Sequence, residues 1–136
     1  RVKVIGQRER LPKSLQEAIE TTEKNTTENS NLNLNLAISY GGKWDILNAV
    51  KKITEEKISA DKIDEKLFES YLSTAGLPNP DLIIRAGGEM RMSNFVLWQA
   101  AYSELYFSPK LWPDFTERDL DLALEEFDKR QRRFGK

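Results

Sequence analysis

The sequence has no cysteine and no histidine in its 136 residues. These two absences exclude disulfide bonds, thiol nucleophiles, Cys/His zinc sites, Ser-His-Asp triads and proton transfer through an imidazole. An excess of positive charge is also missing, because 21 Lys and Arg against 22 Asp and Glu give a formal net charge of -1. A nucleic-acid partner is therefore not expected. The chemistry that remains belongs to carboxylates, guanidinium groups and metals.

Long apolar runs are missing as well. No stretch reaches the roughly 18 consecutive apolar residues that would indicate a transmembrane helix, and the first residues lack the arrangement of a signal peptide, so a cytoplasmic protein is predicted. A length of 136 residues with 39% hydrophobic and 32% charged residues is typical of one globular domain, here spanning residues 1–136. The chain begins with Arg1 inside an apolar stretch, which suggests a piece of a longer protein.

Short apolar segments alternate with segments of helical periodicity along the chain. This alternation predicts an α/β fold with a mostly parallel sheet flanked by helices. Strands are expected at 2–5, 32–38, 81–85 and 105–107. Helices are expected at 11–22, 46–53, 64–72, 94–103 and 116–127.

Local signals mark three of these helix starts. Ser14 followed by Glu17 has the spacing of a capping box, and Asp64 is a candidate N-cap. Thr116 and Asp119 are expected to cap the last helix.

The loop after the third strand carries the densest set of candidate functional residues. Ligands of parallel sheets bind at the carboxyl ends of the strands, and 85–95 follows such an end with two arginines, two glycines and Ser93. Guanidinium groups match the paired oxygens of a diphosphate, glycines let backbone N–H groups approach, and a serine at a helix start adds a hydroxyl and the positive end of the dipole. On residue types alone, a surface loop with solvated arginines and an ordinary serine cap carries equal weight.

Three further features have both a functional and a purely structural interpretation. The glycine turn 39–43 is not a Walker A loop and is interpreted as a tight turn with Lys43 in solvent. Glu104 lies between an apolar segment and a strand, where it suits either a magnesium ion or a salt bridge to an arginine such as Arg85. The basic tail 129–136 is either a helix C-terminus or an anion-binding arm.

Taken together, seven ordered blocks closely resemble the cis-prenyltransferases, and among them the undecaprenyl diphosphate synthases. The resemblance extends upstream through Thr74–Pro78, Tyr40–Gly42 and Val4–Gly6, so it covers essentially the whole chain. The seven blocks are DLIIR (81–85), GGE (87–89), RMSNF (91–95), LWQ (97–99), YSELYF (102–107), LWPDF (111–115) and RRFG (132–135).

The resemblance implies an enzyme that adds isopentenyl diphosphate units to an allylic diphosphate, expected to be farnesyl diphosphate, with cis geometry. It implies dependence on Mg²⁺, a homodimer, and a long-chain polyprenyl diphosphate that carries cell-wall sugars in bacteria. Contact with a membrane would then be peripheral, through the lipid product.

The resemblance also implies roles for individual residues. Substrate-binding positions fall on Arg85, Arg91, Met92 and Ser93, and the magnesium-binding glutamate falls on Glu104. The C-terminal Arg-x-Gly feature, which in relatives reaches the active site of a partner subunit, falls on Arg133 and Gly135. No residue of this chain is assigned a catalytic role.

Two departures from the family pattern bear on activity. Ser39 and Lys43 stand where the family commonly has Asn and Arg, and neither is given a catalytic role. The N-terminal motif Asp-Gly-Asn-Gly-Arg-Trp, which in relatives holds magnesium and the allylic diphosphate, does not occur. The chain is therefore expected to be the C-terminal portion of a synthase, without the N-terminal strand and helices. It would hold the isopentenyl diphosphate half-site, be inactive alone and tend to self-associate.

Two other interpretations compete with the enzyme portion. One is a non-catalytic partner subunit, although the presence of Arg85, Arg91, Ser93 and Glu104 argues against a mere scaffold. The other is a general phosphate-binding α/β module, for which the block 102–107 has no purpose.

Overall fold

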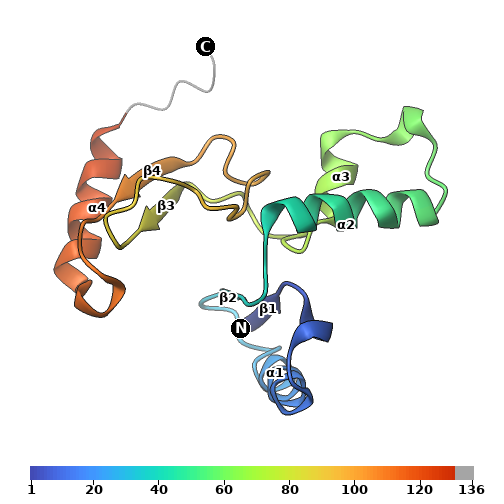
Figure 1. The fold of residues 1–136 in the computed structure, drawn as a ribbon, viewed down its shortest axis with the longest axis horizontal. Helices are drawn as coiled ribbons and strands as arrows, with labels where there is room; N and C mark the ends of the chain where they lie inside the picture. Colours follow the sequence, from blue (N-terminus) through green and yellow to red (C-terminus); the bar gives the residue numbers. More distant parts are fainter. Residues whose placement is uncertain (131–136) are drawn as a thin grey trace. The chain divides into compact units, whose positions relative to one another are not determined.

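The computed structural model of the chain describes residues 1–130, which Figure 1 draws as a ribbon. The chain divides into two compact units with the boundary between Leu77 and Pro78, and each unit is described by itself. The single domain expected for residues 1–136 stays a prediction. Within residues 1–130, no helix is both long enough and apolar enough to cross a membrane.

The first unit begins with two parallel strands and a helix. β1 (Val2–Ile5) pairs with β2 (Leu34–Ala37), in a register that sets Val2 opposite Leu34. The short 3-10 helix η1 (Arg8–Arg10) and helix α1 (Lys13–Asn25) connect the two strands. Val4 and Ile5 are buried, as is Ile19 of α1, and the apolar face of the helix supplies cover for one face of the strand.

An ion pair joins α1 to β1. The Glu23 carboxylate accepts a hydrogen bond of 2.7 Å from the Val4 N–H and binds both terminal nitrogens of the Arg8 guanidinium. Arg8 also donates to the Val4 carbonyl at 2.6 Å. Both main-chain groups of Val4 are thus satisfied by this pair, which fixes the helix against the strand.

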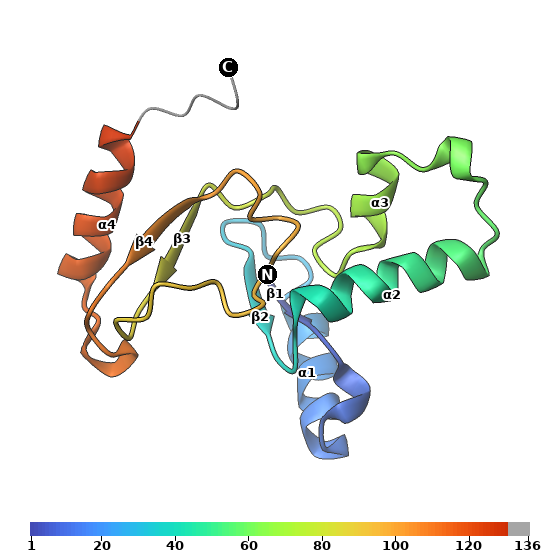
Figure 2. The same ribbon diagram turned by 45° about the horizontal axis from the view of Figure 1, so that its top comes forward.

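The rest of the first unit is helical. Helix α2 (Gly42–Glu55) is followed by the 3-10 helix η2 (Ala60–Lys62) and helix α3 (Glu65–Tyr71), and α2 and α3 lie side by side in Figure 1 and Figure 2. Asp45, which is 1% exposed, accepts hydrogen bonds from the Tyr40 hydroxyl (3.0 Å), the Ser73 N–H (2.9 Å) and the Ser73 hydroxyl (2.6 Å). This buried carboxylate ties the chain after α3 to the start of α2.

The second unit contains the other two strands. β3 (Leu82–Arg85) and β4 (Glu104–Phe107) pair in parallel, with Leu82 opposite Glu104 and Arg85 opposite Phe107. The 3-10 helix η3 (Trp112–Asp114) and helix α4 (Glu117–Lys129) follow, and α4 runs beside β4 in both ribbon views. Every described strand pair is therefore parallel and connected through helices or turns, which confirms the predicted α/β class.

Two of the three predicted caps are confirmed. The Asp64 carboxylate accepts from the Leu67 N–H at 2.7 Å, and Thr116 with Asp119 forms a reciprocal capping box at the start of α4. The Ser14–Glu17 box is wrong, because Pro12 is the residue before α1 and no side chain caps the helix there. Ser14 already lies inside the first turn, too late to act as the N-cap.

The helix expected at 94–103 is also wrong. This segment consists of turns, with isolated hydrogen bonds such as Ala100 N–H to the Val96 carbonyl at 2.9 Å. Ser93, Asn94 and Val96 have φ of 47°, 64° and 37°, left-handed values that interrupt a right-handed helix. Ser93 consequently caps no helix, and the predicted helix dipole is missing from the loop before it. The prediction took apolar residues at nearly every position as a helix covered on most sides, but such a run has no helical period, and Phe95 and Tyr102 are 44% and 72% exposed.

Candidate diphosphate-binding site

Residues 85–93, which we call the arginine loop, leave the carboxyl end of β3. Gly87 and Gly88 have φ of 101° and 73°, conformations that favour glycine. The Gly87 N–H donates to the Lys110 carbonyl at 2.7 Å, and the Gly88 N–H donates to the Ser108 carbonyl at 2.9 Å. The arginine loop is therefore held by its backbone against the segment that follows β4. These amides were expected to face a ligand, but in this structure they bind protein carbonyls.

Arg85 brings the predicted residues of this loop together. Its Nη1 donates to the Ser93 hydroxyl at 2.7 Å and also to the Arg91 carbonyl. The three positions expected to bind one ligand thus lie around one guanidinium group. Arg85 closes the loop in addition to supplying positive charge, a role that the sequence did not indicate.

Arg91 presents its guanidinium group to solvent. Its side chain is 62% exposed and forms an ion pair with Glu89, two residues earlier. Exposed pairs of this kind are weak, commonly about 0.2 to 1 kcal/mol, so an anion that offers several oxygens can compete with Glu89. Glu89 belongs to the GGE block of the family resemblance, but no role was predicted for it.

A pocket of about 360 Å³ adjoins the arginine loop. Three polar residues line it, Arg85, Arg91 and Ser93, and Met92 also lies in its wall. A volume of this size is in the range of small-ligand sites. The lining therefore offers cationic and hydroxyl groups to an anion and apolar side chains to a hydrocarbon. The apolar lining consists of Ile83, Ile84, Ala86, Met92, Phe95, Phe107 and Trp112.

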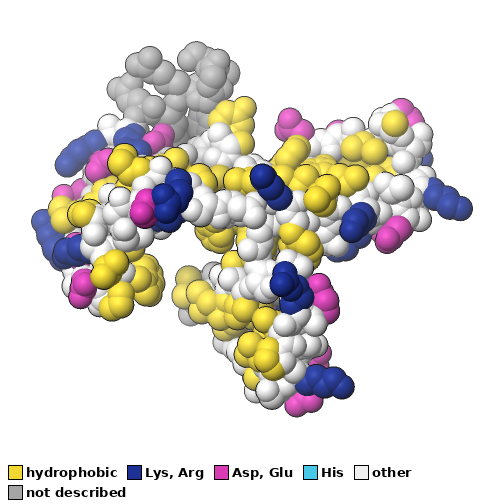
Figure 3. Space-filling view, in the orientation of Figure 1, with side chains coloured by type: hydrophobic (Ala, Val, Ile, Leu, Met, Phe, Trp, Pro, Cys, Tyr) yellow, Lys and Arg dark blue, Asp and Glu magenta, His cyan; other side chains and the backbone are white. Residues whose placement is uncertain are grey.

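Trp112 was missed as a site residue. It is 74% exposed and stacks on Phe115 with ring centroids 5.8 Å apart and planes at 14°. Apolar side chains gather at the loop between β4 and α4 in Figure 3, where Leu111 is 62% exposed. The Trp-Pro pair belongs to the block LWPDF, so the sequence marked the position without indicating that it lines the pocket.

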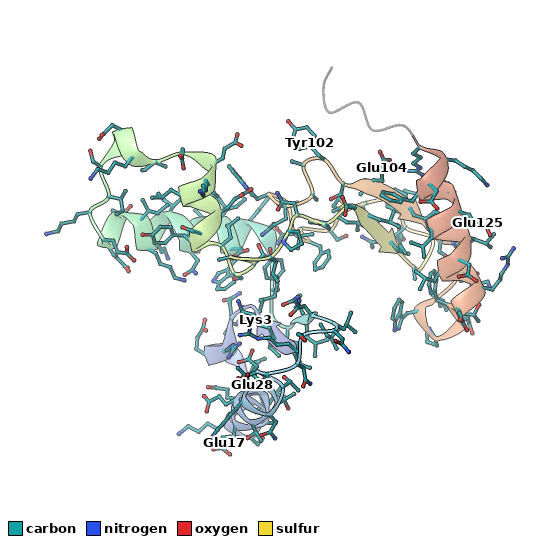
Figure 4. The ribbon with its side chains drawn as sticks, turned by 180° about the vertical axis from the view of Figure 1, so that it is seen from behind. Lys3, Glu17, Glu28, Tyr102, Glu104 and Glu125 are labelled. Atoms are coloured by element: carbon teal, nitrogen blue, oxygen red, sulfur yellow. The ribbon has the colours of Figure 1, made fainter. Side chains whose placement is uncertain are left out.

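Glu104 lies away from the arginine loop. It is the first residue of β4, opposite Leu82, whereas Arg85 is opposite Phe107, so roughly 10 Å of strand separates the two ends. The Glu104 carboxylate pairs with Arg130 at 2.9 Å, and Figure 4 shows Glu104 close to the end of α4. Arg130 also donates to the Leu105 carbonyl at 3.0 Å and to Glu126, and the hydrogen bonds to Glu126 and Glu104 raise the pKa of its guanidinium group.

The interpretation of Glu104 as the partner of an arginine in a salt bridge is therefore confirmed, and the arginine is Arg130, not the Arg85 given as an example. Magnesium prefers oxygen ligands, and a neighbouring cation disfavours it. Among residues 1–130, no three carboxylates gather into a cluster, and Arg130 occupies the Glu104 carboxylate. In this structure the Glu104 carboxylate is paired with Arg130, and the metal role of Glu104 stays a prediction.

The remaining candidate positions lie in the glycine turn and in the basic tail. Ser39 has φ of 51°, and the chain then turns into α2 at Gly42 with Lys43 exposed, as expected of a tight turn. Arg133 and Gly135 of the basic tail lie outside the described residues.

Comparison with known proteins gives a consistent result. The family model for putative undecaprenyl diphosphate synthases matches residues 1–135. A tritrans,polycis-undecaprenyl-diphosphate synthase (geranylgeranyl-diphosphate specific) of Thermoplasma volcanium is 51% identical over 139 residues, which cover 99% of this chain and 54% of that protein. A ditrans,polycis-undecaprenyl-diphosphate synthase ((2E,6E)-farnesyl-diphosphate specific) of Legionella pneumophila (strain Paris) is 48% identical, covering 99% of this chain and 58% of that protein.

A solved structure is similar in fold and sequence. Lavandulyl diphosphate synthase from Lavandula x intermedia, crystallised with dimethylallyl diphosphate, has a TM-score of 0.95 and 44% identity, over 100% of this chain and 60% of that one. This chain spans somewhat more than half the length of each of these proteins, between 54% and 60%.

Proposed function

Because the chain belongs to the undecaprenyl diphosphate synthase family of cis-prenyltransferases, we propose that its second unit binds isopentenyl diphosphate at the arginine loop. The observation that carries this proposal is the convergence of Arg85, Arg91 and Ser93 at a pocket whose other lining residues are apolar. Isopentenyl diphosphate has the same division, with a charged head and a short hydrocarbon tail.

The polar and the apolar lining residues of the pocket would contribute different parts of the binding free energy. Each charge-assisted hydrogen bond from Arg91 or Ser93 to a diphosphate oxygen is worth about 1.5 to 3 kcal/mol. Each buried methylene group of the tail adds about 0.8 kcal/mol against the apolar lining. Arg91 would exchange its exposed pair with Glu89 for the diphosphate, while Arg85 keeps the loop closed.

For the whole protein, we propose cis addition of isopentenyl diphosphate to an allylic diphosphate, giving a long-chain polyprenyl diphosphate that serves as a lipid carrier. The specificities named for the two relatives, farnesyl and geranylgeranyl diphosphate, support an allylic co-substrate of this class. A homodimer, in which Arg133 and Gly135 reach a partner subunit, belongs to the same proposal. Dependence on Mg²⁺ also belongs to this proposal, and family membership supports it.

Titration calorimetry of the chain with isopentenyl diphosphate tests the half-site. Arg91→Ala should raise the Kd by about tenfold to a hundredfold, since it removes one set of charge-assisted hydrogen bonds. Arg118→Ala is the matched control, because Arg118 is another exposed arginine, paired with Glu125 on α4 and absent from the pocket lining. Equal Kd values for the wild type and the Arg91→Ala variant would contradict the assignment.

A further inference from the structure

We propose that Lys110 and Asp119 are positioning residues that hold the arginine loop in its diphosphate-binding conformation. The proposal rests on the proposed function, because it concerns the affinity of that site. Neither residue lines the pocket. They act through the backbone of Gly87, and so connect the start of α4 to the loop that binds the ligand.

The first link is between the arginine loop and Lys110. Gly87 donates its N–H to the Lys110 carbonyl at 2.7 Å, which is shorter than the 2.9 Å between the Gly88 N–H and the Ser108 carbonyl. A Cβ on Gly87 would meet no atom within 4 Å, so packing leaves this glycine unconstrained and the hydrogen bond fixes its position. A displacement of Lys110 would therefore move the turn between Arg85 and Arg91.

The second link is between Lys110 and the start of α4. The Lys110 ammonium contacts both oxygens of Asp119, at 2.8 and 2.9 Å. Asp119 is 8% exposed and also accepts from the Thr116 N–H (2.8 Å) and the Thr116 hydroxyl (2.6 Å). Lys110, although its side chain is 48% exposed, is thus attached to a carboxylate that the capping box already immobilises.

The same contacts hold the pKa of the Asp119 carboxyl at about 2, the Lys110 hydrogen bond having the largest effect, followed by those from Thr116. Asp119 is therefore charged at neutral pH. The ion pair with Lys110 persists under the conditions in which a diphosphate would bind.

Positioning and simple electrostatics predict opposite results for Asp119→Asn. This variant removes a negative charge from the second unit, and by charge alone it should strengthen the binding of an anion. If Asp119 acts by holding Lys110, the variant should weaken binding. Asn still accepts a hydrogen bond from the Thr116 N–H, so the α4 cap is largely retained.

The experiment compares Lys110→Met, which keeps the carbonyl used by Gly87, with Asp119→Asn and the control Arg118→Met. Amide hydrogen exchange at Gly87 measures the link itself, and calorimetry with inorganic diphosphate measures the Kd. We expect faster exchange at Gly87 and a Kd raised by about threefold to tenfold in both variants, since partners in one hydrogen-bond network couple at this level. Arg118→Met should change neither quantity. Circular dichroism verifies that each variant is folded. If Asp119→Asn disturbs the capping box, Lys110→Met still tests the link, because it leaves the box intact.

The outcomes separate this proposal from the proposed function. Unchanged exchange at Gly87 would overturn the link, and faster exchange with an unchanged or lower Kd would overturn its effect on binding. If the wild-type chain binds no diphosphate while exchange at Gly87 still rises, the proposed function fails and the structural link is supported.

Discussion

Removing the buried carboxylate of Asp45 should strongly destabilise the first unit. Asp45 is 1% exposed and accepts hydrogen bonds from the Tyr40 hydroxyl, the Ser73 N–H and the Ser73 hydroxyl. Asp45→Ala leaves all three donors without this acceptor. Because a buried donor left without its acceptor costs about 1 to 3 kcal/mol, and three donors lose one here, the free energy of unfolding should fall by at least about 3 kcal/mol.

Two further variants sharpen this prediction. Asp45→Asn keeps one carbonyl oxygen for the two Ser73 donors. It also places an amide beside the Tyr40 hydroxyl, which can rotate to accept a hydrogen bond. The free energy of unfolding should therefore fall by only about 1 kcal/mol. Asp61→Ala is the matched control, because Asp61 is exposed and its hydrogen bond to Ser59 is local. Its effect should stay within about 0.5 kcal/mol.

Urea unfolding followed by circular dichroism measures all three values. The expected order of destabilisation is Asp45→Ala, then Asp45→Asn, then Asp61→Ala. An Asp45→Ala variant as stable as Asp61→Ala would show that the carboxylate gains no more from its three hydrogen bonds than its burial costs, and would refute the reasoning.

Three other predictions concern pH, backbone geometry and activity. Burial alone would raise the pKa of Glu23, but the hydrogen bonds from Arg8 and the Val4 N–H and the charge of Arg8 lower it overall. The stability that the Glu23–Arg8 pair contributes should therefore be complete above pH 4.5 and fall as acid protonates Glu23. Thermal melts from about pH 3 to 7 measure this loss, which the Glu23→Gln variant should not show. Gly6→Ala should lower the free energy of unfolding by about 1 to 3 kcal/mol or more, because Gly6 has φ of 118° and a Cβ would lie 2.1 Å from the Ile38 carbonyl oxygen. An unchanged midpoint of urea unfolding would contradict this. If, as part of the proposed function, residues 1–136 hold only the isopentenyl diphosphate half-site, the chain alone should transfer no prenyl group from an allylic diphosphate to radiolabelled isopentenyl diphosphate. Measurable turnover would show that these residues hold more than that half-site.

Local signals in the sequence predicted local structure well. Thr116 and Asp119 lie three residues apart, so their capping box depends on one turn of chain and is readable from spacing. The strand at 81–85 is likewise a short apolar run between turn residues, and the structure has β3 at Leu82–Arg85. Grouping Arg85, Arg91 and Ser93 at one site required only that the loop fold back at Gly87 and Gly88.

Contacts set by strand register could not be predicted in the same way. Glu104 pairs with Arg130, which is 26 residues away, because the parallel register places Glu104 at the opposite strand end from Arg85. Nothing in the residue types favours Arg130 over Arg85 as the partner. The hydrogen bond between Gly87 and Lys110 could not be predicted from the sequence either, since it uses a backbone carbonyl that any residue could supply.

The distance between the two ends of β3 and β4 has a consequence for engineering this unit. The arginine loop and the Glu104–Arg130 pair share no hydrogen-bond partner among the described residues, and roughly 10 Å of paired strand lies between them. Substitutions at such a separation usually contribute independently to free energy. Affinity at one end and the anchoring of α4 at the other can therefore be optimised in separate libraries and then combined by simple addition.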